Sequence, residues 1–224
     1  MLIQELFNQA LTQFPLSVNF TPRDTSPAQL YVTASAYSTF PNMLIGVDVA
    51  LDGNPLGSLT LFANEAYSHK ALVARLFPVE FNDLDQHTLT FSPSTPNTVC
   101  DFNDAIGATL LMISDVPPFV WNPTGPIPQY TTYQSQISGP ALLFFSGSAF
   151  MSGGGSMGVE VVIGGQPVAI SQMQAGDTTH EAFPPRFTQV MLKYSKDPIE
   201  IGFSTNSGEV ASDQNDNYQL ALIY

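Results

Sequence analysis

The chain has 224 residues, of which 44% are hydrophobic and only 11% are charged, and its formal net charge is −13. This length suits one large or two small domains with a sizeable core, and the apolar content excludes intrinsic disorder. Nineteen acidic against six basic residues would repel a phosphate backbone, so we expect no direct contact with nucleic acid. With so few charges, uncharged polar residues or neighbouring subunits must cover the surface.

A single cysteine, Cys100, excludes an intrachain disulfide and any metal site built from several cysteines. We interpret it as a small buried hydrophobe, since a catalytic thiol would need an activating base that the sequence does not identify. No apolar run approaches the roughly 20 residues of a membrane span. The N-terminus also lacks the basic region and cleavage site of a secretory signal. We therefore expect no cofactor and no membrane partner.

Residues 2–14 have apolar side chains at three- and four-residue spacings, which predicts a short amphipathic helix that ends at Pro15. Such a short helix must dock on its own domain, on a neighbouring subunit as an arm, or on a membrane. The polar face lacks the Lys and Arg of interfacial helices, which disfavours the membrane. We expect contacts with neighbouring subunits at this helix and at a tryptophan further along the chain: Leu2, Leu6, Phe7, Leu11, Phe14 and Trp121.

From Leu30 onward the pattern changes to short apolar segments separated by Gly, Pro, Asn and Asp. Strands at regular spacing with turn residues between them favour an antiparallel sandwich or barrel. No helix long enough for a βαβ crossover is predicted, which argues against a nucleotide-binding α/β fold. The candidate strands are 30–37, 43–51, 56–62, 70–77, 87–91 and 105–113.

One eleven-residue phrase, at 46–56, recurs in similar form at 158–168. Apolar residues alternate with small or polar ones in both copies, which is the period of a half-buried strand. Asp52-Gly53 and Gly164-Gly165 then supply the positive-φ positions of a tight hairpin turn. Each copy therefore predicts a strand, a two-residue turn and the start of a partner strand.

Other landmarks recur at nearly the same offset and indicate a tandem duplication. His69 matches His180 and Arg75 matches Arg186. The phrase Asp-x-Asn-Asp occurs before each closing strand. We therefore predict an all-β chain of two tandem antiparallel, jelly-roll-like β-sandwiches with a short N-terminal helix. The expected parts are a helix and arm (1–26), a first sandwich (27–113), a proline-rich connector (114–138) and a second sandwich (139–224).

The two Asp-x-Asn-Asp phrases are candidate calcium sites, because calcium prefers closely spaced oxygen ligands. Asp and Asn also build turns by bonding their own backbone, and both phrases stand where a turn is expected. We favour the turn. The candidate ligands are Asp101, Asn103, Asp104, Asp213, Asn215 and Asp216.

The other candidate sites have structural alternatives. His69 and His180 could be ligands or bases, but structural hydrogen bonding at a strand edge is the better interpretation, because their neighbours differ. Exposed aromatic residues in predicted loops could stack on sugar rings, although most aromatic residues in a β-rich chain belong to the core. These loop residues are Phe40, Tyr67, Trp121, Tyr130 and Tyr133. No catalytic pattern of nucleophile, base or paired carboxylates is evident, so we expect no enzyme.

With its two sandwiches, expected N-terminal helix and low charge, the chain resembles viral jelly-roll structural proteins. The segments 64–72 and 101–104 are similar to β-sandwich proteins of phage virions. The resemblance implies a coat protein, or a cement protein that decorates a phage head. Located in the virion, it would assemble as a trimer or other homo-oligomer and contact other virion proteins. The alternative function is a carbohydrate-binding or adhesin module with glycans as partners.

Overall fold

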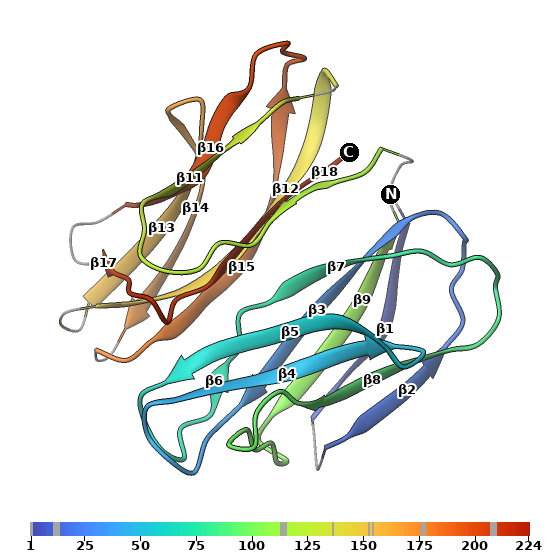
Figure 1. Cartoon of the computed structure of the whole chain (residues 1–224), viewed down its shortest axis with the longest axis vertical. Helices are drawn as coiled ribbons and strands as arrows, with labels where there is room; N and C mark the ends of the chain where they lie inside the picture. The colour runs from blue at the N-terminus through green and yellow to red at the C-terminus, as the bar shows by residue number, and fades with distance from the viewer. Residues whose placement is uncertain are drawn as a thin grey trace. The chain divides into compact units, whose positions relative to one another are not determined.

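In the computed structural model, the described residues are 2–10, 14–112, 116–135, 137–151, 153, 155–175, 178–206 and 210–224. Within these ranges the chain forms β-strands and no α-helix, so no described segment could cross a membrane as a helix. The chain divides into two compact units, Met1–Val116 and Pro117–Tyr224 (Figure 1). The all-β prediction is therefore confirmed.

The first unit is a sandwich of two antiparallel sheets. One sheet has the strand order β1-β9-β3, with β6 and β7 both pairing with β3, and the other has the order β2-β8-β4-β5. The ring of Phe7 on β1 packs edge to face on the ring of Phe91 on β8, with 5.3 Å between the ring centroids. Side chains of the two sheets are therefore in contact. The strands are β1 (Leu2–Ala10), β2 (Leu16–Phe20), β3 (Ala28–Ala36), β4 (Met43–Leu51), β5 (Asn54–Ala63), β6 (Lys70–Ala71), β7 (Arg75–Val79), β8 (His87–Pro93) and β9 (Ala105–Met112).

The second unit repeats this plan. One sheet has the order β10-β18-β12-β15, with the short β17 also on β12, and the other has the order β11-β16-β13-β14. Its core is built mainly of Leu, Phe, Val and Ala from both sheets, with Phe145, Phe203 and Tyr218 fully buried. The strands are β10 (Phe119–Trp121), β11 (Gln129–Tyr133), β12 (Gly139–Met151), β13 (Gly155–Ile163), β14 (Gln166–Ala175), β15 (Glu181–Leu192), β16 (Ile199–Thr205), β17 (Val210–Ala211) and β18 (Tyr218–Ile223).

Both units have the strand order of an eight-stranded jelly roll. Each unit has eight strands when β6 and β7 are counted as one strand and the short β17 is omitted. In both units, one sheet then has the strand order first, eighth, third and sixth, and the other sheet has the order second, seventh, fourth and fifth. The duplication predicts this equivalence. The closing strands are also expected to be central because their leucines are strongly apolar, and β9 and β18 each lie between two neighbouring strands, as Figure 1 shows for β9.

The expected N-terminal helix is wrong, because residues 2–10 form the edge strand β1. This strand pairs antiparallel with β9 from Leu2↔Met112 to Ala10↔Ala105. The side chain of Gln4 is buried, donates to the Thr21 carbonyl at 2.8 Å and accepts from the Arg23 amide at 3.0 Å. The free edge of β9 offers a row of hydrogen bonds that local helical spacing cannot match, so tertiary pairing overrides the periodicity.

The proline-rich segment 114–138 also contributes strands. It contains β10 and β11, and both lie at the edge of their sheets. Proline lacks an amide donor and is tolerated next to edge strands, where one side of the backbone needs no partner. The eight strands of each sandwich therefore include two from a segment that the sequence assigned to an arm or a connector.

The repeated phrase forms the predicted hairpins. Asp52 and Gly53 have φ values of 49° and 78°, and Gly164 and Gly165 have φ values of 57° and 76°. Positive φ at both central residues is the geometry of the type I′ turn, whose twist matches that of the strands. Gly46 begins the first phrase because a side chain there would place its Cβ 2.5 Å from the Leu59 carbonyl oxygen.

Candidate functional site: the paired histidine–aspartate turns

Each Asp-x-Asn-Asp phrase forms a tight turn directly before its closing strand. In the first sandwich the Asp104 amide donates to the Asp101 carbonyl at 3.0 Å. The Asp101 side chain accepts from the Asn103 amide at 2.8 Å, and the buried Asp104 side chain accepts from the Asp101 amide at 3.1 Å. Carboxylates that bond their own backbone in this way hold a turn in place.

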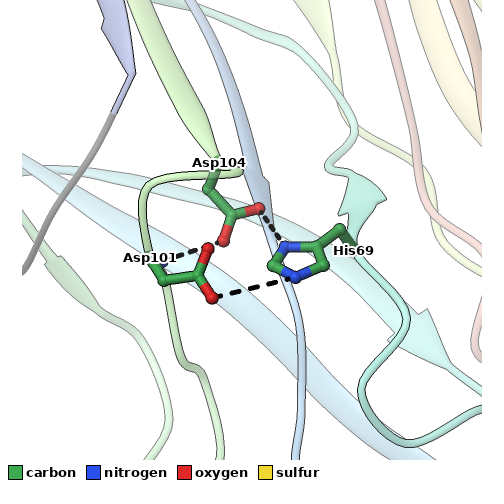
Figure 2. Close-up of side chains that lie close together, drawn as sticks. All are labelled: His69, Asp101 and Asp104. Atoms are coloured by element: carbon green, nitrogen blue, oxygen red, sulfur yellow. Dashed lines mark hydrogen bonds and ion pairs between the residues drawn. The ribbon is translucent and has the colours of Figure 1, made fainter.

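The first turn is tied to two other parts of the sandwich. The Ser35 hydroxyl of β3 donates to Asp104 Oδ1 at 2.9 Å and accepts from the Ala105 amide at 3.0 Å. His69, just before β6, places Nδ1 3.0 Å from Asp104 Oδ1 and Nε2 3.9 Å from Asp101 Oδ2, as Figure 2 shows. Pairing of β3, β6 and β9 in one sheet brings these groups together from three distant parts of the sequence.

The second sandwich reproduces the arrangement. Ser148 of β12 donates to Asp216 Oδ1 at 2.7 Å, and the Asp213 amide donates to Asp216 Oδ2 at 2.8 Å. His180 Nε2 lies 3.3 Å from Asp213 Oδ1 and 3.8 Å from Asp216 Oδ2. The Asn215 amide donates to Asp213 Oδ1 at 2.7 Å. A cluster kept in both copies is what a shared structural role would require.

The two carboxylates of the second turn differ in their ionisation. Burial raises the pKa of Asp216 above its usual value, although hydrogen bonds from the Asp213 amide and from Ser148 oppose this shift. Partial burial also raises the pKa of Asp213, but hydrogen bonds from the Asn215 amide and from His180 outweigh it, so the net shift is downward. Asp213 is thus the more readily ionised partner of His180.

The histidine and the two aspartates form a cluster in each sandwich: His69, Asp101 and Asp104 in the first, and His180, Asp213 and Asp216 in the second. One potential ligand atom from each residue lies within 4.8 Å of the other two, so each cluster could face a cation. The carboxylate oxygens of Asp104 are already occupied, however, by the Ser35 hydroxyl, His69 and the Asp101 amide. A calcium ion at these oxygens would compete with these hydrogen bonds. Asn103 and Asn215 take part in the turns through their backbone amides. The turn hypothesis accounts for the geometry without a metal ion.

His87, at the start of β8, lies at the other end of the first sandwich. Its Nδ1 is 2.7 Å from Asp52 Oδ2 in the β4–β5 turn, and its Nε2 is 3.5 Å from Asp83 Oδ1. Partial burial raises the pKa of Asp52, but hydrogen bonds from the Thr88 amide and from His87 outweigh it and lower the pKa overall. This group pins the hairpin turn to β8.

Cys100 is half-buried, and its thiol donates to the Ser35 carbonyl at 3.4 Å. Burial, together with the negative charges of Asp104 and Asp101, raises the pKa of the thiol far above its usual value. The neighbourhood therefore suppresses the thiolate that nucleophilic chemistry would need.

The residues expected to contact neighbouring subunits are in several environments. Leu2 is exposed, Leu6 and Phe14 are half-buried, and Phe7 packs into the core. Leu11 lies outside the described residues. Trp121 is on β10, and its ring stacks on Phe203 of its own sandwich at 5.8 Å.

The aromatic residues that the sequence places in loops fall into two groups. Phe40 and Tyr67 are exposed loop residues. Trp121, Tyr130 and Tyr133 belong to strands, and Tyr133 is buried.

Two surface features escaped the sequence analysis. Phe102 is 72% exposed within the first Asp-x-Asn-Asp turn, where the second copy has Gln214. Met191 and Tyr194 are 73% and 57% exposed at the edge of the second sandwich. An alignment of the two copies would have identified these positions, because one copy has an apolar residue where the other has a polar residue.

Comparisons with known proteins give distant structural neighbours. PNGase F from Flavobacterium meningosepticum is 9% identical with a TM-score of 0.46, and the match covers 99% of this chain and 95% of that chain. PNGF-II is 7% identical with a TM-score of 0.40, over 99% and 65% of the two chains. Latent PorU from Porphyromonas gingivalis is 10% identical with a TM-score of 0.33, over 94% and 18%.

No protein-family model and no curated protein matches the sequence. The structural neighbours are too distant for their activities to be transferred to this chain. What the protein does must therefore be inferred from its own surface.

Proposed function

We propose that the chain is a non-enzymatic structural component of a virion, a coat or cement protein, that acts by assembling with copies of itself. The observation that carries this proposal is an apolar open edge on the second sandwich. The tandem jelly-roll plan and the low charge support it, because interface centres are depleted in charged residues.

The apolar edge lies where the terminal strands β14 and β15 of the two sheets meet. An open groove of about 350 Å³ is lined there by Ile163, Val168, Gln189, Val190, Met191 and Leu192. Large apolar side chains are exposed on or next to these strands: Val168, Ile170, Phe187, Met191 and Tyr194. Clustered exposed apolar residues mark interaction sites, and methionine and aromatic residues are enriched in interfaces.

The first sandwich provides an internal comparison. Val79 pairs with Ala28 as Val190 pairs with Ala141, so Glu80 occupies the position of Met191. Three residues further along, Asp83 stands where the second copy has Tyr194. The fold therefore accepts a carboxylate at both positions, and the exposed Met191 and Tyr194 are not needed to form the sandwich. A stable interface buries about 800 Å² on each partner, so this edge would be the centre of a larger contact.

The double substitution Met191→Glu and Tyr194→Asp tests the proposal, because it gives the second copy the residues of the first. We expect the intact protein to be an oligomer in analytical ultracentrifugation and the double variant to dissociate at the same concentration. Glu80→Gln is the matched control and should leave the oligomer unchanged. An intact protein that stays monomeric at high concentration would contradict self-assembly.

The virion assignment has a separate test. Concentrated protein is examined by negative-stain electron microscopy for shells or lattices, and purified particles from a producing culture are examined for the protein by mass spectrometry. Absence of the chain from such particles would contradict the virion role even if the protein oligomerises.

A further inference from the structure

Three aromatic side chains are exposed at the end of the first sandwich that carries the His69 turn. Phe40 in the β3–β4 loop is 57% exposed, Tyr67 in the β5–β6 loop is 69% exposed, and Phe102 in the β8–β9 loop is 72% exposed. In a jelly roll these three loops lie at the same end of the sandwich. Single exposed apolar residues are common, but three in adjoining loops form a surface that needs an explanation.

Direct contacts join the three loops. The Tyr67 amide donates to the Ser38 carbonyl at 2.7 Å, which ties the β5–β6 loop to the β3–β4 loop. Tyr37 and Val99 exchange backbone hydrogen bonds of 2.9 Å, which tie the β3–β4 loop to the β8–β9 loop. The Tyr37 ring lies 4.5 Å from the His69 ring and 6.5 Å from the Tyr67 ring, measured between centroids. The surface is therefore built on a fixed support.

The duplicated sandwich shows that the fold does not require these rings. The second copy retains the histidine–aspartate turn, and Phe150 lies 4.8 Å from His180 as Tyr37 lies near His69. At the positions of the three exposed rings the second copy has Gly153, Thr178 and Gln214. None of these is aromatic. The turn is common to both copies, whereas the aromatic surface belongs to the first alone.

The backbone conformation of Tyr67 also supports a binding role for this surface. Its φ is 59°, in the left-handed region that a bulky residue other than glycine rarely adopts. Strained backbone persists where the surrounding structure holds it, and it concentrates at binding sites. Here the hydrogen bond to Ser38 holds the loop while the Tyr67 ring remains exposed to solvent.

Polar groups adjoin the rings. The side chains of His69 and Asp101 are 32% and 34% exposed. An imidazole and a carboxylate can donate to and accept from hydroxyl groups, while flat aromatic faces pack on the apolar C–H faces of a sugar ring. The net charge of −13 disfavours phosphate, sulfate or carboxylate groups on the ligand. We propose that this surface, formed by Phe40, Tyr67, His69, Asp101 and Phe102, binds a neutral carbohydrate.

The first experiment measures binding of the intact protein to an array of neutral and sialylated glycans, followed by saturation-transfer difference NMR with neutral oligosaccharides that the array retains. We expect retention of neutral glycans and magnetisation transfer to sugar C–H protons. No retention and no transfer at millimolar oligosaccharide would overturn the proposal, and so would retention of sialylated glycans alone.

The second experiment uses the duplication to choose variants. Phe102→Gln introduces the residue of the second copy, and Tyr67→Asn removes the ring with a side chain that tolerates left-handed backbone. The double variant should weaken glycan binding at least tenfold and keep the circular dichroism spectrum of the intact protein. Leu84→Gln is the control, because Leu84 is 53% exposed in the β7–β8 loop at the opposite end of the sandwich, and it should leave binding unchanged.

A protein partner is the competing occupant of this surface. If glycan binding is unchanged in the Phe102→Gln and Tyr67→Asn variant, the proposal is overturned. If the intact protein binds no glycan and the same variant dissociates the oligomer, the surface is a contact between copies of the chain and the proposal is also overturned. Loss of glycan binding with the oligomer intact supports it, and it does so whether or not the virion assignment holds.

Discussion

Replacing Leu222 with alanine removes three carbon atoms from the centre of the second sandwich. Leu222 is fully buried on β18, between Phe119 of β10 and Leu143 of β12, and it belongs to the core that both sheets share. The transfer free energy of three buried carbons is about 2.4 kcal/mol, at about 0.8 kcal/mol for each. A cavity that the neighbouring strands fill only partly adds to this, so we expect a loss of about 3 to 5 kcal/mol in the free energy of unfolding.

Urea denaturation followed by tryptophan fluorescence measures this change. Trp121 is the chain's one tryptophan and stacks on Phe203 of the same core, so its emission reports unfolding of the sandwich that contains Leu222. Gln174→Ala is the control, because Gln174 is exposed on β14 of the same sandwich and does not line the groove, so its truncation should cost less than about 0.5 kcal/mol. A loss below about 1 kcal/mol for Leu222→Ala would show that the end of the chain is peripheral to the core.

Four further predictions test other parts of the structure. Asp216→Ala leaves the Ser148 hydroxyl and the Asp213 amide without their acceptor and should cost about 1 to 3 kcal/mol, measured by urea denaturation. A chelator should leave the melting temperature unchanged, whereas an ion bound at one hundred times its dissociation constant would add about 2.7 kcal/mol, so a clear drop would support calcium. Because the pKa of Asp213 is lowered in the fold, its stabilising contribution is complete above about pH 4 and is lost as the pH falls below that value. Asp213→Asn should therefore reduce the loss of stability on acidification, measured by urea denaturation at about pH 5 and about pH 3. Deleting residues 2–10 removes β1 and should destabilise the first sandwich, and a truncated protein with an unchanged melting curve would contradict the pairing of β1 with β9.

The sequence predicted the structure best where the conformation depends on residues that are adjacent in the sequence. The hairpins at Asp52-Gly53 and Gly164-Gly165 follow from the φ angles that such turns need, and the structure has them where the repeated phrase predicts. The range 43–51 is a strand with the bounds that the sequence assigns to it. The Asp-x-Asn-Asp turns rest on hydrogen bonds across two or three residues, which short polar side chains make without distant partners.

The sequence failed where the partner of a segment lies far away along the chain. Residues 2–10 have a helical spacing of apolar residues, but their pairing with β9 decides their conformation. The proline-rich stretch before Gly139 looked like a connector because its edge strands β10 and β11 are short and lie beside several prolines. Strand pairing across about a hundred residues leaves almost no mark on local composition.

By itself, then, the sequence determined the all-β class, the duplication and the turns, because these follow from local φ preferences and from the period of the apolar residues. Only the tertiary structure decided that each sandwich has the eight strands of a jelly roll and that His69 meets Asp104 from 35 residues away. It also decided which aromatic rings are exposed, since the sequence placed both Tyr67 and Tyr133 in loops but only Tyr133 is buried in a core. The reason is that burial and sheet pairing depend on the whole chain, whereas a turn depends on a few adjacent residues.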